Sequence, residues 1–313
     1  MSWLRLHKNY FFAFVFLSVI LLLVVLFGMH PTDHEFINSM SYRIYLGQQP
    51  YEDFEYVRPP LSLYLHSLSF HIFPENAILF SRVVFFFQML YISFISCLIL
   101  IRINYLKAGN ILFYTLIFLL LSLHNFPAMP WHTVDGLFFS LTCIYFLTNA
   151  INGQVIKNLF ISGICCCLAT LCKQNFLLIA PIIFLISAYL FRLRSFYFFS
   201  GFALVLVLFL SFLQFNNLLS FYVNSSSDSA TIFYIIKSIA KSLSLSSYVF
   251  FPTLIAISIL SFFKKINLIE LKFLVNSSFC VFLFLNVLEM YAFQNHVPKT
   301  IYQFLWVSSI LIF

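Results

Sequence analysis

Charged residues are scarce in this sequence. Asp, Glu, Lys and Arg make up only 9% of its 313 residues, whereas 62% are hydrophobic and 44 are Phe. About a quarter of the residues of a soluble globular domain are charged, so this composition excludes a domain that has water as its main solvent. Apolar runs recur along the whole chain, and about 20 apolar residues are enough for a helix to cross a bilayer. The sequence therefore predicts an integral membrane protein.

Several sequence motifs are also missing. There is no Walker-type phosphate loop, no glycine pattern for dinucleotides and no zinc-protease helix motif. These absences argue against a nucleotide-driven pump and against an intramembrane metalloprotease. The seven Cys lie within or beside apolar runs and lack the spacing of metal ligands, so we expect them to act as small hydrophobic side chains.

The apolar runs predict an all-α polytopic membrane protein that forms a single transmembrane domain over residues 1–313. The first run follows a basic stretch and has no small-residue cleavage site, which favours a retained signal anchor. The runs yield about ten helices of the length that a bilayer requires. These predicted spans are 10–29, 77–101, 110–124, 134–151, 156–172, 176–191, 196–215, 248–263, 273–293 and 300–313.

The distribution of charge predicts the orientation of these spans. With the amino terminus in the cytoplasm, the basic residues between spans fall mostly on the inner side, as the positive-inside rule requires. The acidic residues fall outside or near the outer ends of the helices, and only Glu270 falls inside. The net charge of +7 then reflects anchoring to anionic lipid headgroups, not to nucleic acid. We expect a plasma membrane, of the bacterial inner-membrane type, with the outer loops in the periplasm or outside the cell.

Two outer segments, 30–76 and 216–247, are too long for simple connectors. Apolar residues at helical spacing in the first segment predict a short surface helix that ends at Gly47. A second surface helix is predicted from Pro59 to about His71, because proline is tolerated in the first turn of a helix. The segment 30–76 is the candidate catalytic loop.

Carboxylates are concentrated in this loop. Asp33 and Glu35 lie just beyond the first span, at the boundary between water and lipid, where an amphiphilic substrate presents its polar head. A general base would be needed at such a place. Asp53 and Glu55 follow in the same loop, just before Arg58. Alternatively, these acids keep the loop solvated and pair with Arg43, Arg58 and Arg82.

Three later residues are further candidates. Lys173 ends the span 156–172 on the outer face, where the positive-inside rule does not require a cation; it either holds a phosphate or snorkels from a tight helical hairpin. Asp135 begins the span 134–151, where it either favours the helix dipole or serves a site. His132 can ligate a metal, but it has no recognisable ligand spacing and also suits an interface residue.

The candidate residues follow a defined order along the chain. An acidic pair after the first span is followed by Gly47-x-x-Pro50-Tyr51-x-Asp53, Arg58-Pro59-Pro60-Leu61-x-x-Tyr64-Leu65, Phe73, Arg82, Asp135 and Lys173. This order, over about residues 10–190, resembles that of the GT-C glycosyltransferases that use polyprenyl-phosphate sugars. That superfamily includes the protein O-mannosyltransferases and lipid A aminoarabinose transferase.

The resemblance implies a GT-C-type enzyme in which an acceptor hydroxyl or amine attacks a lipid-linked sugar at the outer membrane boundary, usually with inversion. It implies that Asp33 is the catalytic carboxylate and that Glu35 assists it or helps to hold a divalent metal. Arg58, Arg82 and Lys173 would bind the donor phosphate, because fixed cations stabilise charge that grows on the leaving group. The supporting residues would be Asp53, Glu55, Asp135 and His132. The implied partners are a polyprenyl-phosphate sugar donor, a glycan, lipid or protein acceptor, and membrane lipids.

Two other classes of function stay open. A transporter or lipid flippase is also polytopic and contains buried charges, although transporters commonly have duplicated halves and no duplication is visible here. A truncated, non-catalytic membrane protein would also suit a chain that ends at Phe313 inside an apolar run. Donor lipid that binds and raises thermal stability would favour the enzyme over this last class.

Overall fold

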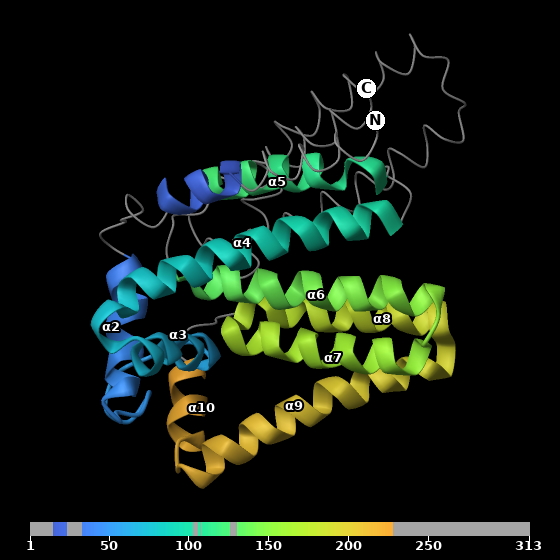
Figure 1. The fold of residues 1–313 in the computed structure, drawn as a ribbon. Coiled ribbons are helices and arrows are strands. Elements are labelled where there is room, and N and C mark those ends of the chain that lie inside the picture. The colour runs from blue at the N-terminus through green and yellow to red at the C-terminus, as the bar shows by residue number, and fades with distance from the viewer. Residues whose placement is uncertain (1–14, 24–32, 103–105, 107, 126–129, 228–313) are drawn as a thin grey trace, which may run out of the picture. The chain divides into compact units, whose positions relative to one another are not determined.

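A computed structural model describes residues 15–23, 33–102, 106, 108–125 and 130–227 (Figure 1). Every regular element within these ranges is a helix, and no strand occurs among them. The described part is therefore all-α, as predicted. The predicted spans 248–263, 273–293 and 300–313 lie outside the described residues, and only 15–23 of the predicted first span is described, as helix.

Four helical stretches of the described part are long and apolar enough to cross a membrane. They are Pro74–Arg102, His132–Ile151, Val155–Cys172 and Ile179–Phe215. The shortest has 18 residues, and at about 1.5 Å per residue it is about 27 Å long, close to the thickness of a hydrocarbon core. These apolar helices associate the chain with a membrane.

The helices of this region match the predicted segments within a few residues. They are α4 (Ala77–Arg102), α5 (Ile111–Asn125), α6 (His132–Asn152), α7 (Val155–Cys172), α8 (Ile179–Phe191) and α9 (Phe196–Phe215). Two details differ from the prediction. The apolar helix at α5 is shorter than a span, and α8 begins late because a 3₁₀ helix, Gln174–Leu178, precedes it.

The apolar stretch Ile179–Phe215 is divided between α8 and α9. Arg192 adopts a left-handed backbone conformation, with a φ of 52°, and begins a 3₁₀ turn that ends at Ser195. An α-helix cannot continue through such a residue, so the chain reverses direction between α8 and α9 (Figure 1).

Both predicted helices of the first outer segment are present as α2 (Asp33–Tyr45) and α3 (Leu61–Ile72). Helix α2 ends before Gly47, whose φ of 86° suits glycine and whose amide donates to the Ile44 carbonyl at 2.9 Å. Helix α3 begins directly after Pro60. The short α10 (Leu219–Ser227) opens the second outer segment.

A small hydrophobic core joins α2 and α3 to the loop between them. Its buried members are Ile37, Phe54, Tyr56 and Leu63. Met40 and Ile44, two of the apolar residues at helical spacing, pack against this core. Phe36 and Leu46 belong to the same apolar set but are exposed. The core therefore fixes the loop that carries Arg58.

Two glycines allow α7 and α9 to approach closely. A Cβ atom added at Gly163 would lie 2.0 Å from the carbonyl oxygen of Phe198, and one added at Gly201 would lie 2.1 Å from that of Phe160. The contact is reciprocal, because each glycine faces the backbone of the other helix. Small residues commonly permit such close helix packing in membranes.

Replacing either glycine by alanine is expected to lower the thermal unfolding midpoint of the purified protein. The methyl group would overlap backbone atoms, and overpacking of this kind costs about 1 to 3 kcal/mol. Gly109→Ala is the matched control, because a Cβ there meets nothing within 4 Å. Midpoints for Gly163→Ala and Gly201→Ala equal to that of the control would contradict the close contact.

Candidate functional site

Asp135 lies at the centre of a group of buried polar side chains. It occupies the first turn of α6, and 0% of its surface is exposed. One carboxylate oxygen accepts a hydrogen bond from His66 Nε2 of α3 at 2.9 Å, and the other accepts from Gln88 Nε2 of α4 at 2.8 Å. Asp135 therefore ties α3 and α4 to the start of α6.

The position of Asp135 suits the first of the two roles predicted for it, the helix-dipole role. A negative charge in the first turn of a helix is favoured by the helix dipole. Both carboxylate oxygens are also engaged by side chains from other helices, as a buried carboxylate requires. Since both oxygens are occupied, Asp135 is suited to position its neighbours and not to accept a substrate proton.

Two predicted phosphate-binding cations contact the first two residues of α6. The Arg58 guanidinium donates to Nε2 of His132 at 2.9 Å, and the Lys173 ammonium donates to Oγ1 of Thr133 at 3.1 Å. His132 and Thr133 are consecutive residues. Side chains from before α3 and after α7 are thus brought to one helix terminus, and we refer to Arg58 and Lys173 as the cation pair.

Lys173 is held inside the protein. It follows α7 in an extended conformation, and only 5% of its surface is exposed. The next residues pack on α6, because the Phe176 ring covers Gly136 so closely that a Cβ atom there would lie 2.1 Å from the ring. A snorkelling lysine would extend its ammonium into water, so that alternative is wrong for Lys173.

Arg58 is positioned by its backbone as well as by His132. The Tyr51 hydroxyl donates to the Arg58 carbonyl oxygen. Burial raises the pKa of the Tyr51 phenol, and nearby Tyr222 raises it further, so the phenol stays protonated and can donate. A guanidinium only donates hydrogen bonds, so His132 accepts through Nε2 and is assigned as the neutral imidazole.

The remaining predicted site residues are distributed differently. Arg82 is buried on α4, the helix that also supplies Gln88. Asp33 begins α2 and Glu35 lies in its first turn, but their side chains are outside the part that the structure describes.

Asp53 and Glu55 do not join this group; both are exposed. A carboxylate oxygen of Asp53 accepts the amide of Gln49 at 2.6 Å, and its carbonyl oxygen accepts from Arg43 at 2.8 Å. Asp53 therefore stabilises its own turn. Its carboxylate does not form the predicted pair with Arg43, because Arg43 bonds the backbone oxygen.

The described residues contain no group of three His, Cys, Asp or Glu side chains placed to hold a metal ion. Both ring nitrogens of His132 lie within hydrogen-bond distance of the Arg58 guanidinium, Nε2 at 2.9 Å and Nδ1 at 3.3 Å, so Arg58 occupies the place beside the ring that a metal ion would need. These residues do not fit a metal ion at the start of α6, and no chemical step is assigned to one. The six described Cys are buried and free, in keeping with their predicted role as small hydrophobic side chains.

Sequence reasoning missed His66 and Gln88. Gln88 could have been recognised from the sequence, because a polar side chain within an apolar span is costly unless it has a partner. His66 could not have been recognised in this way, since its pairing with Asp135 depends on how α3 packs.

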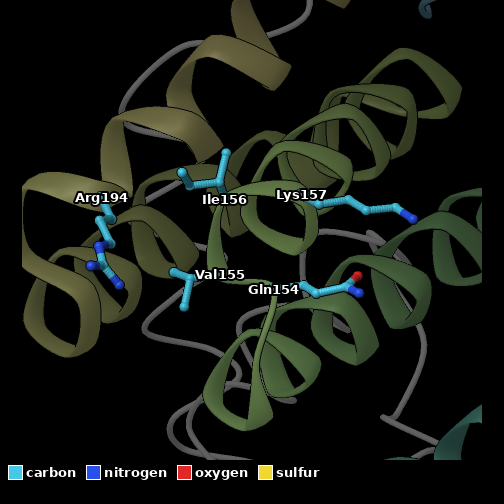
Figure 2. Close-up of a pocket in the computed structure, with 5 residues that line it drawn as sticks. All are labelled: Gln154, Val155, Ile156, Lys157 and Arg194. Carbon is cyan, nitrogen blue, oxygen red and sulfur yellow. The ribbon is translucent and has the colours of Figure 1, made fainter.

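A surface pocket lies at the other end of α7. It has a volume of about 560 Å³ and is lined by Gln154, Val155, Ile156, Lys157 and Arg194 (Figure 2). The Lys157 and Arg194 side chains point in different directions (Figure 2), and both are exposed. This pocket lacks the converging, buried side chains found at the start of α6, so we place the candidate site there.

Comparison of the chain with models of known families, with curated proteins and with solved structures gives no match. The function is therefore inferred from the placement of these side chains and from the order of residues in the sequence.

Proposed function

We propose that this chain is a membrane glycosyltransferase of the GT-C type. It transfers a sugar, with inversion, from a polyprenyl-phosphate-linked donor to a glycan, lipid or protein acceptor at the outer face of the membrane. The observation that carries the proposal is the cation pair, in which Arg58 and Lys173 contact consecutive residues at the start of α6.

The start of α6 suits an anion. The helix dipole places partial positive charge at the start of α6. The amides of Val134 and Asp135 already donate to the Trp131 carbonyl, and the Asp135 carboxylate shares this terminus. The fixed positive charges of Arg58 and Lys173 add to this potential, and a phosphate is the anion that such a group binds best. A phosphate held there would lie at the end of α7, an apolar helix long enough to cross a membrane.

The proposed reaction is a single displacement at the anomeric carbon. The acceptor oxygen or nitrogen forms a bond to that carbon while the bond to the phosphate oxygen breaks. The acceptor proton passes to the carboxylate of Asp33, with Glu35 two residues further along the chain, and polyprenyl phosphate leaves as an anion. Arg58 and Lys173 stabilise the charge that grows on the leaving phosphate, with Arg82 as a further cation.

The proposed topology has about ten spans, which is the number of apolar runs long enough to cross a bilayer. The membrane is a bacterial inner membrane, and the amino terminus lies on its cytoplasmic side. Exposed Lys157 and Arg194 lie at the other end of α7 from Lys173. They are suited to the inner face by the positive-inside rule, which leaves the cation pair at the outer face.

Sugar transfer by the purified full chain tests the proposal. The protein is given a radiolabelled polyprenyl-phosphate sugar and candidate acceptors, and Asp33→Asn is compared with wild type. Loss of a general base is expected to slow transfer by about 100- to 10,000-fold, without a matching loss of donor binding. Equal rates for both proteins would remove Asp33 as the base, and no transfer by wild type to any acceptor would count against the enzyme.

A further inference from the structure

The hydroxyl group of Tyr56 is buried without a hydrogen bond. Only 2% of the Tyr56 surface is exposed, and no residue in the described ranges bonds its oxygen. A buried hydroxyl without a partner destabilises the fold in which it is found. Polar groups of this kind in a native protein need an explanation, and an absent ligand is one.

The ring of Tyr56 is fixed by its surroundings. It belongs to the core between α2 and α3, stacks on Phe36 with ring centroids 6.4 Å apart, and lies 6.2 Å from the ring of Tyr51. The position of the hydroxyl is therefore set by the fold and not by any bond of its own.

The hydroxyl lies within the electrostatic influence of the candidate site. Arg58, Cys172 and Asp135 all act on the Tyr56 phenol. These residues belong to the loop before α3, the end of α7 and the start of α6, so they identify the same junction as the cation pair.

The protonation state of Tyr56 is well defined. Burial raises the pKa of its phenol, and the guanidinium of Arg58 opposes this only in part. A phenol with a raised pKa is protonated at neutral pH, so Tyr56 has an O–H group to donate and no negative charge to repel an anion.

We propose that Tyr56 binds the lipid-linked donor by donating its O–H to a phosphate oxygen beside Arg58. This inference rests on the proposed function, and it adds a neutral donor to the cation pair. Tyr51 differs, because its hydroxyl already donates to the Arg58 carbonyl within the fold.

The test compares Tyr56→Phe with Tyr51→Phe in the full chain, purified in detergent. Each substitution removes one hydroxyl and keeps the ring. Without lipid, Tyr56→Phe should unfold at the wild-type temperature or above it, because an unsatisfied group is lost, whereas Tyr51→Phe should unfold at a lower temperature. With a polyprenyl monophosphate as the probe, Tyr56→Phe should raise the Kd about tenfold, as expected for one hydrogen bond to a charged group.

Three results would overturn the inference. A lower unfolding temperature for Tyr56→Phe without lipid would show that the hydroxyl has a partner inside the protein. Wild-type affinity in Tyr56→Phe, together with weakened binding in Arg58→Gln, would reject Tyr56 and leave the proposed function standing. A wild-type protein that neither binds the polyprenyl monophosphate nor transfers sugar would reject both.

Discussion

Replacing Lys173 by Met is expected to slow sugar transfer by about 100- to 1,000-fold, the usual effect of removing one group that stabilises transition-state charge. The Lys173 ammonium is buried and held 3.1 Å from Thr133 at the start of α6. Methionine keeps most of the length and apolar character of the side chain but removes the charge. Single-turnover transfer from a labelled polyprenyl-phosphate sugar, measured in detergent, provides the rate.

Lys157→Met is the matched control for this substitution. Lys157 lies in the first turn of α7 and is exposed, so its replacement removes the same charge at the other end of the same helix. Its transfer rate should equal that of wild type. A similar loss in both variants would show that only overall charge matters, and wild-type activity in Lys173→Met would exclude Lys173 from the site.

Asp135→Ala is expected to lower the free energy of unfolding by about 3 to 5 kcal/mol, because removing one member of a buried pair leaves the others without a partner. His66 Nε2 and Gln88 Nε2 would both lose their acceptor. The effect should appear as a lower unfolding midpoint in detergent and as weaker expression in the membrane.

A double-mutant cycle with His66→Ala isolates the pair. If the two side chains interact, the loss in the double variant should be smaller than the sum of the single losses. Glu55→Ala serves as the control, since Glu55 is an exposed acid in the segment before α3. Additive losses, or an Asp135→Ala midpoint equal to that of Glu55→Ala, would refute the anchoring role of Asp135.

Much of the described fold could be predicted from local signals in the sequence. Hydropathy located α4, α6, α7 and α9, since a bilayer requires long apolar helices. Gly47 and the proline pair before α3 marked the two helices of the first outer segment. The late start of α8 could not be predicted from the sequence. Phe176, which precedes α8, packs against Gly136 of α6, and this contact forms only when α6 and α7 are packed together.

The candidate site was predicted in part. Arg58, His132, Asp135 and Lys173 do meet, although nothing local in the sequence brings them together. The partners of Asp135 were missed because His66 and Gln88 are 69 and 47 residues away from it along the chain. Asp53 and Glu55 were placed in the site by their charge and by the family resemblance. Both are exposed, and the carboxylate of Asp53 bonds the amide of Gln49 within its own turn. Charge patterns thus indicated candidate residues but not which carboxylate oxygens are occupied.

A cryo-electron microscopy structure of the full chain with a polyprenyl-phosphate sugar bound would test the phosphate site most directly. Density for the phosphate is expected at the start of α6, within hydrogen-bonding distance of Arg58 and Lys173. Phosphate density beside Lys157 and Arg194, at the other end of α7, would contradict it.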